Sequence, residues 1–435
     1  MATVAKAVTF LSLWLVLQPT RAQEQDESWK AVVDNHSVSE LFEPSATIAV
    51  NGPSHFPKPT RKIDDNATII VEPTFGTHRP NEDVIMAYAE GYQLSYYMMF
   101  LETLAATGFT GDVVLAIADG TYVRDDVEDY LRTYADRNDP TKPSVVVYQS
   151  PLDCDGTANH KRKVTPRGDT DPFQMCRLSH VYGWKDELGH VTATAHDPRD
   201  GRVVATLRYE WYWIWSNRYD AHSWIMLLDA RDSFFQSNPF AHVPREPNRD
   251  RPSGLLFLYG ENAEATRLGK SRKNLKWLER GYGPATLKAL QDKPTICSGS
   301  TMGEQIAIET YLRAMVNEHD ECHIKMAGSD QGFHNYLYYS NKLHNAEPIR
   351  RIVVWEQGRG AINNLGALRT KPLAEWGMYN NKTHDVFQWD GETLSPVVHQ
   401  WDRDHALHSY IFGKRHAKWT KEWKEAEQKR QKRQL

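Results

Sequence analysis

Two aspartates that follow an apolar run are the residues of this chain with the clearest chemical potential. The run at 224–228 has the length and composition of a buried strand and is followed by Asp229 and Asp232. In an open α/β sheet, ligands bind just beyond the carboxyl ends of the strands. Two carboxylates held together repel unless a cation neutralises them. The segment therefore predicts a crevice that holds Mn²⁺ or Mg²⁺. The alternative is that Asp229 caps a turn and Asp232 pairs with Arg231.

A histidine much later in the chain could complete this site. His399 follows a short apolar stretch at 396–398. Its imidazole would favour manganese over calcium. The chain has 18 histidines, so a hydrogen-bonded structural histidine is the simpler interpretation of the sequence alone.

A small, hydroxyl-rich segment at 296–303 contains Ser298 and Gly299. We interpret it as a turn, because small residues let a substrate approach the backbone closely. It could equally be a loop that starts the following helix, with Ser300 or Thr301 as the cap.

The segment 328–336 packs an acid, an amide, an imidazole and aromatic side chains into nine residues. Asp330 and Gln331 are its candidate functional side chains. A structural interpretation, compatible with the functional one, makes Ser329 the N-cap of a helix that runs into Leu337.

Continuous apolar strands alternate with helical patterns along much of the chain. This order predicts an α/β fold with a mostly parallel sheet covered by helices on both faces. No G-x-G-x-x-G fingerprint opens the first helix, so a dinucleotide site is not indicated. Residues 150–200 are expected to be loop-rich. The expected strands are 84–89, 113–118, 144–148, 224–228 and 255–259, and the expected helices are 94–105, 125–135, 205–218, 263–291 and 303–318.

The ends of the chain suggest its organisation. We expect a signal peptide at 1–22, a polar stem at 23–80, one catalytic domain at 81–410 and a basic tail at 411–435. The apolar run near the start is shorter than the ~20 residues of a spanning helix, which favours a cleaved signal over an anchor. The net charge of −4 argues against a dedicated nucleic-acid binder.

Glycosylation sequons and cysteines point to the secretory pathway, in the ER or Golgi lumen or outside the cell. The sequons begin at Asn35, Asn66 and Asn381. Four cysteines suit an oxidising compartment. The most local pairing joins Cys154 to Cys176 and Cys297 to Cys322; the sequence leaves two other pairings open.

The tail at 411–435 carries nine lysines or arginines against three glutamates, with Trp419 and Trp423 four residues apart. A solvated terminal helix is the simpler prediction. The alternative is an amphipathic segment that contacts an anionic membrane surface.

Taken in order, these motifs resemble those of nucleotide-sugar glycosyltransferases of the GT-A fold. The region 208–240 is similar to their donor site, where a strand ends in "LLD-x-D". Ser298-Gly299 resembles their "N-x-G" strand, Asp330-Gln331 the "D-Q" motif of the glycogenin-like group, and His399 its late metal ligand. The segments 229–240 and 330–339 also resemble a little-characterised branch seen in algae, plants and oomycetes. One departure is that Arg231 lies inside the acidic motif, where the family has Asp-x-Asp.

The resemblance implies a Rossmann-like GT-A fold and a donor that is a nucleoside diphosphate sugar. Asp229, Asp232 and His399 would hold the metal, and Arg208 would contact the diphosphate or base. Arg231 would supply part of the cation's charge if Asp232 does not reach it. Ser298 and Gly299 would line the donor side.

The implied activity is transfer of a hexosyl or pentosyl group to a glycan or glycoprotein hydroxyl. Asp330 and Gln331 would face the sugar and the acceptor, and an amide cannot act as a general base. The sequence leaves retention or inversion open, and the glycogenin-like resemblance favours retention. Two other hypotheses are a catalytically silent, secreted carbohydrate-binding protein on the same scaffold and a metal-dependent phosphoester or glycan hydrolase.

Overall fold

A computed structural model describes most of the chain. The described residues are 40–59, 66–117, 125–135, 141–149, 152–155, 175–195, 197–245, 252–324, 326 and 328–434. The predicted signal peptide and the sequon at Asn35 lie outside them.

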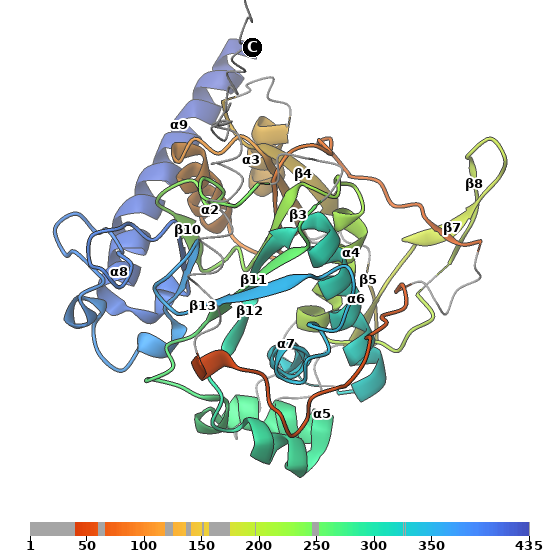
Figure 1. The fold of residues 1–435 in the computed structure, drawn as a ribbon. Helices are drawn as coiled ribbons and strands as arrows, with labels where there is room; N and C mark the ends of the chain where they lie inside the picture. Colours follow the sequence, from red (N-terminus) through yellow and green to blue (C-terminus); the bar gives the residue numbers. More distant parts are fainter. Residues whose placement is uncertain are drawn as a thin grey trace, which may run out of the picture.

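The centre of the fold is a seven-stranded sheet with the order β13-β11-β12-β9-β2-β3-β4 (Figure 1). Only β12 runs antiparallel to its neighbours among these strands. Apart from β12, the strands are largely continuous apolar runs, because helices cover both faces of the sheet. The predicted mixed α/β, Rossmann-like fold class is therefore confirmed. The strands are β2 (Val84–Tyr88), β3 (Asp112–Ile117), β4 (Ser144–Gln149), β9 (Trp224–Leu228), β11 (Leu255–Gly260), β12 (Ile296–Glu304) and β13 (Arg351–Trp355).

Alternate residues of these strands face two separate cores. Ile85 and Val113 pack with α2 (Leu94–Ala106) and α3 (Asp125–Ala135). Met86 and Val114 face the core beneath the helices of the opposite face. Those helices are α4 (Val204–Ser216), α6 (Gln305–Cys322) and α7 (Ser329–Tyr339), with α5 (Arg272–Leu290) packed on α7 (Figure 1).

The segment predicted as a turn at 296–303 is instead the fully buried strand β12, so that prediction is wrong. The strand pairs with β9 on one side and β11 on the other, and Ser300 lies opposite Leu228. Neither Ser300 nor Thr301 caps a helix, since α6 begins only at Gln305.

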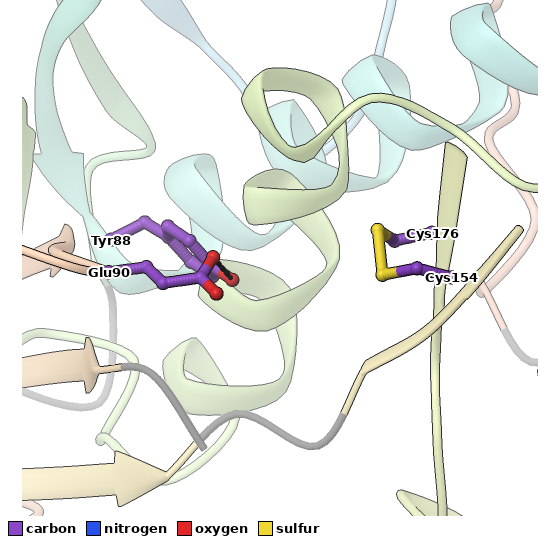
Figure 2. Close-up of a disulfide and its surroundings, with 4 residues drawn as sticks. All are labelled: Tyr88, Glu90, Cys154 and Cys176. Carbon is purple, nitrogen blue, oxygen red and sulfur yellow. Dashed lines mark hydrogen bonds between the residues drawn. A yellow bond between two sulfur atoms is a disulfide. The ribbon is translucent and has the colours of Figure 1, made fainter. Parts of the chain in front are cut away.

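The region 150–200 holds more regular structure than predicted. Strands β5 (Leu152–Asp155) and β6 (Met175–Leu178) pair with each other, and β7 (Tyr182–Lys185) and β8 (Val191–Ala195) form a projecting hairpin with β1 (Thr68–Ile69) (Figure 1). A disulfide joins Cys154 on β5 to Cys176 on β6, as predicted (Figure 2).

The second predicted disulfide is wrong, because Cys297 and Cys322 are free. The two thiols face different partners. The Cys297 Sγ lies 3.9 Å from the Nδ1 atom of His399, whereas the Cys322 Sγ lies 3.9 Å from a carboxylate oxygen of Glu318 in its own helix.

A second, three-stranded sheet brings the late part of the chain back to β9. Its order is β10 (Ser233–Phe235), β15 (Val397–His399) and β14 (Ile362–Asn364). His399 lies opposite Ser233 on one side and Asn364 on the other. The remaining elements are η1 (Glu40–Phe42), η2 (Leu268–Lys270), η3 (Gly366–Leu368), η4 (Leu373–Trp376), η5 (Trp401–Arg403), α8 (His405–Tyr410), η6 (Ile411–His416) and α9 (Ala417–Gln434).

The two ends of the described chain lie against the domain. Within the range predicted as a stem, Phe42 and Phe56 are buried in the core. In α9, Trp419 and Trp423 are half-buried, and Trp423 meets the Tyr130 ring edge-on at 5.1 Å. These two tryptophans therefore pack against the chain's own domain. Among the described residues, no helix combines the length and apolar character needed to cross a membrane.

Candidate functional site

The candidate site lies at the carboxyl edge of the parallel strands. Asp229 directly follows β9 and Glu261 directly follows β11. Because β12 is antiparallel, its first residues, including Ser298, lie at the same edge. The position agrees with the strand-end rule from which the sequence predicted it.

Backbone contacts hold Asp229 in a tight turn at this edge. Its amide donates to the Gly299 carbonyl at 3.1 Å, and the Ser233 hydroxyl donates to the Asp229 carbonyl at 2.7 Å. Gly299 is required here for space. A Cβ atom at this position would lie 2.6 Å from the Asp229 Oδ2 atom and 3.0 Å from the Cε1 atom of His399.

Asp232 is the more buried of the two acids, with 8% of its side chain exposed. Its carbonyl accepts from the Gln400 amide at 2.7 Å, which ties it to the end of β15. Burial raises the pKa of Asp232, and the nearby Asp229 carboxylate adds to this effect although His399 opposes it. Asp232 is therefore an acid whose charged form is disfavoured mainly by its burial.

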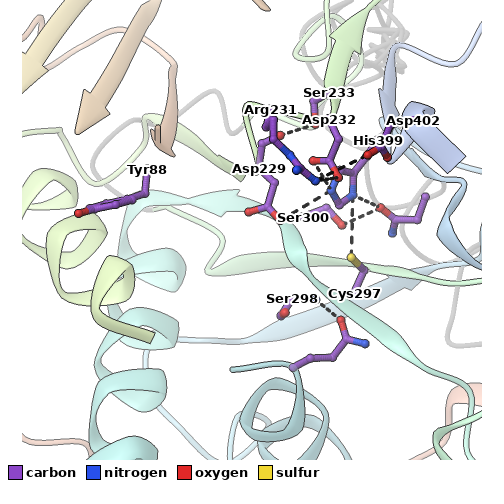
Figure 3. Close-up of polar contacts among 12 residues, drawn as sticks. Tyr88, Asp229, Arg231, Asp232, Ser233, Cys297, Ser298, Ser300, His399 and Asp402 are labelled. Atoms are coloured by element: carbon purple, nitrogen blue, oxygen red, sulfur yellow. Dashed lines mark hydrogen bonds and ion pairs between the residues drawn. The ribbon is translucent and has the colours of Figure 1, made fainter. Parts of the chain in front are cut away.

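His399 faces both acids from β15, with 1% of its side chain exposed. Its Nδ1 atom lies 2.8 Å from the Asn364 Oδ1 atom. Its Nε2 atom is buried without a hydrogen-bond partner, 3.9 Å from Asp229 Oδ2 and 3.7 Å from Asp232 Oδ1 (Figure 3). The structure thus places the residues predicted as metal ligands side by side.

These residues fit a divalent cation. One ligand atom from each of Asp229, Asp232 and His399 lies within 4.8 Å of the others. Two carboxylates and an imidazole are a donor set suited to Mn²⁺. The orphaned Nε2 atom and the space left by Gly299 are the features expected where a cation would sit.

Arg208 links this cluster to the other predicted motif. From α4 it donates to Asp229 and, at 3.0 Å, to the Oδ2 atom of Asp330. The Ser298 hydroxyl donates to the same Asp330 oxygen at 3.0 Å. Burial raises the pKa of Asp330, and the Arg208 charge opposes that rise. Residues from β9, α4, β12 and α7 therefore form one continuous polar chain.

Gln331 extends this chain to a carboxylate that the sequence interpretation missed. Its Nε2 atom donates to Glu261 at 3.4 Å and to Asn274 at 3.2 Å. Burial raises the pKa of Glu261 to about 7. The signal for this residue was available, because Glu261 immediately follows the apolar run at 255–260, as Asp229 follows its own strand.

Arg231 lies on the outer side of the acids. It is half-exposed, 3.9 Å from an Asp232 oxygen and 3.6 Å from an Asp402 oxygen (Figure 3). The alternative pairing of Asp232 with Arg231 is therefore present as a loose contact, and it coexists with the contact between Asp232 and His399.

Comparison with known proteins assigns no family to this chain. No protein-family profile and no curated protein matches its sequence. Among solved structures, the galactosyltransferase LgtC in complex with donor and acceptor sugar analogs is similar with a TM-score of 0.35 and 8% identity, over 73% of this chain and 86% of that chain. The site geometry is therefore the basis for assigning a function.

Proposed function

We propose that this protein is a metal-assisted glycosyltransferase that uses a nucleoside diphosphate sugar as donor and a glycan or glycoprotein hydroxyl as acceptor. The observation that carries the proposal is the cluster of Asp229, Asp232 and His399 at the carboxyl edge of the sheet, joined through Arg208 to Asp330. This arrangement sets a cation site beside polar side chains that can bind a sugar.

Asp229, Asp232 and His399 would hold Mn²⁺ or Mg²⁺. A divalent cation at this position supplies neutralising charge for a diphosphate. Glycosyl transfer needs that charge, because the transition state is positive at the anomeric carbon while the departing diphosphate becomes more negative.

The other residues of the polar chain bind and orient the reactants. Arg208 already donates to Asp229 and Asp330, and the remaining hydrogens of its guanidinium can bind a phosphate oxygen. Asp330 accepts hydroxyl hydrogens and orients the donor sugar or the acceptor. Gln331 positions these groups through its amide dipole, and Ser298 and Gly299 allow the donor to approach the backbone of β12. Arg231 is placed to add positive charge at the outer side of the acids.

The proposed compartment is the lumen of the secretory pathway or the cell exterior. The disulfide between Cys154 and Cys176 supports an oxidising compartment. The sequon residues Asn66 and Asn381 are exposed, as glycosylated asparagines must be.

A second candidate is a carbohydrate-binding protein on the same scaffold that does no chemistry. Arg231 favours it, because its guanidinium lies 3.9 Å from Asp232 and could take over part of the cation's role. Slow hydrolysis of a nucleotide sugar in the presence of Mn²⁺ would separate the two, since only an enzyme cleaves the donor.

The test combines Mn²⁺ titration, binding of a nucleoside diphosphate by calorimetry, and a screen of nucleotide sugars for hydrolysis. We expect Asp229→Asn to lower Mn²⁺-dependent donor hydrolysis at least about 100-fold, since it removes a charge on which the diphosphate site depends. The matched control is Asp200→Asn, because the Asp200 side chain is 70% exposed and its carboxylate lies 3.5 Å from the Nδ1 atom of His323. Full activity in Asp229→Asn would remove the proposed cation role.

Gly299→Ala tests the same site without changing a charge. Its methyl group would lie 2.6 Å from an Asp229 oxygen, so it must displace a ligand or fill the cation's space. We expect Mn²⁺ binding and donor hydrolysis to be lost together. Normal Mn²⁺ affinity in this variant would show that the cation binds elsewhere.

A further inference from the structure

We propose that Asn364 sets the tautomer of His399 and thereby makes its Nε2 atom available as a metal ligand. Asn364 is fully buried at the end of β14, and it belongs to none of the sequence motifs described above. This inference rests on the metal site of the proposed function. It concerns a property of the metal-free protein that can be measured by itself.

The pairing of the strands places Asn364 beside His399. Strands β14 and β15 are parallel, and Asn364 is the register partner of His399. The Leu365 amide also donates to the His399 carbonyl at 3.0 Å. Side chains of cross-strand neighbours lie on the same face of a sheet, so the amide meets the imidazole directly.

The orientation of the Asn364 amide is fixed by its surroundings. Its Nδ2 atom donates to two backbone carbonyls, those of Tyr259 at 3.2 Å and Gly260 at 3.3 Å. A carbonyl oxygen only accepts, so the reversed amide would set its own oxygen against both of them. The Oδ1 atom must therefore point the other way, toward His399 and the Ser300 hydroxyl, which donates to it at 3.1 Å.

This orientation decides which ring nitrogen of His399 carries the hydrogen. The Asn364 Oδ1 atom lies 2.8 Å from the His399 Nδ1 atom and only accepts, so the hydrogen must be on Nδ1. The other neighbour of Nδ1, the Cys297 sulfur at 3.9 Å, is a weak acceptor and does not compete. In the neutral ring the lone pair is then on Nε2, the buried nitrogen that faces Asp229 and Asp232.

The consequence is a preformed ligand. Neutral histidine in water favours the opposite tautomer, with the hydrogen on Nε2, which would point a donor at the cation. A fixed acceptor on Nδ1 selects the Nδ1–H tautomer before the metal binds, so metal binding does not have to supply the free energy of changing the tautomer. The acceptor also holds the ring plane in place. The acceptor is itself anchored by the end of β11, so the position of Asn364 depends on the central sheet.

The neighbouring residue provides a matched control. Asn363 lies on the same strand and is also buried, but its side chain points to the opposite face. There it donates to the Phe387 carbonyl and the Ser395 hydroxyl and accepts from Gln357. Asn363→Ala removes three buried hydrogen bonds, the number that Asn364→Ala removes in addition to the one with His399.

The first measurement is a ¹H–¹⁵N spectrum of the histidine rings in the metal-free protein at alkaline pH, assigned by loss of a signal in His399→Gln. We expect the Nδ1–H tautomer in the native chain, its loss in Asn364→Ala, and its persistence in Asn363→Ala. The spectrum of the native chain keeps the proposal testable if Asn364→Ala does not fold, because an Nε2–H signal from His399 would already contradict it.

The second measurement is Mn²⁺ affinity by electron paramagnetic resonance. We expect Asn364→Ala to weaken binding about 10–100-fold, as loss of an outer partner of a histidine ligand does. Asn363→Ala should leave the affinity unchanged. An unchanged tautomer and affinity in Asn364→Ala, or an equal loss in both alanine variants, would overturn the proposal.

The two hypotheses fail in different ways. If the native protein has the Nδ1–H tautomer, loses it in Asn364→Ala and still cleaves no nucleotide sugar, the proposed function fails and this inference stands. If the native protein cleaves a donor but His399 carries its hydrogen on Nε2, the inference fails and the proposed function stands.

Discussion

Two clusters of charged side chains lie on opposite sides of helix α4, and they differ in the side chains that face their carboxylates. Arg208 of this helix belongs to the metal cluster, defined as Asp229, Asp232 and His399 with Arg208 itself. Glu210, two residues later, belongs to a second cluster that we name the ionic cluster. Its members are Asp197, Arg199, Arg202, Glu210 and Asp320.

In the ionic cluster, the protein supplies its own cations. Arg199 is fully buried and contacts both Asp197 and Glu210, and Arg202 lies 3.4 Å from Asp320. Burial lowers the pKa of the adjacent His319, and the charge of Arg202 lowers it further. In the metal cluster, the histidine nitrogen instead faces two carboxylates. Buried charge alone is therefore no sign of function, whereas two carboxylates that face a histidine nitrogen without a hydrogen-bond partner mark a candidate metal site.

The largest expected effect on stability comes from breaking the ionic cluster. Arg199→Met removes a cation and leaves the carboxylates of Asp197 and Glu210 buried with Arg202 about 4 Å away. Breaking a buried ion pair from one side costs about 3–5 kcal/mol. Urea unfolding should show this loss, while the folded fraction binds Mn²⁺ as the native protein does. A loss below ~1 kcal/mol would show that the fold does not depend on the Arg199 cation. Weakened Mn²⁺ binding would show that the two clusters are not separate.

The opposite behaviour is expected in the metal cluster. Because the folded state raises the pKa of Asp232, its charged form destabilises the metal-free fold at neutral pH. Asp232→Asn should therefore leave the metal-free protein at least as stable as before. At an Mn²⁺ concentration about 100 times its Kd, the native protein should gain about 2.7 kcal/mol, and the variant little. A large loss of stability without metal would make Asp232 a structural residue.

The predictable part of this molecule follows from local apolar patterning. The runs at 84–89, 113–118 and 144–148 became β2, β3 and β4 almost at the expected residues, because strands buried on both faces must be apolar throughout. The same rule located Asp229 at a strand end. The predicted helix at 263–291 begins later, at Arg272, and bends at Gly283, where φ is 79°.

The remaining features depend on long-range pairing that no local pattern encodes. The middle of strand β12, at 298–301, consists of serine, glycine and threonine, so only its neighbours β9 and β11 identify it as a strand. His399 reaches the acids because β15 pairs with β10, over 160 residues away in the chain. Asn364 stands in an unremarkable sequence, and its role follows only from the carbonyls of Tyr259 and Gly260 that orient it.

The most specific expected effect is confined to one pH window and concerns Glu261, which unlike Glu210 has no ion pair in the described part of the chain. Its pKa rises from the usual value near 4.5 to about 7, because burial disfavours its charged form. Between these two values the folded state binds more protons than the unfolded state, so this group makes stability fall as pH rises through that window.

Glu261→Gln should remove that dependence. We expect the variant to match the native protein near pH 4 and to be more stable by about 1–3 kcal/mol near pH 8, since each pKa unit corresponds to about 1.4 kcal/mol. Urea unfolding of both proteins across this range tests it, with Glu309→Gln as the control because Glu309 already has Arg313 as its cation. Parallel stability curves for Glu261→Gln and the native chain would contradict the assignment. A gain in stability together with a loss of donor cleavage would show that the charge of Glu261 is kept at the sheet edge for the reaction, at the expense of the fold.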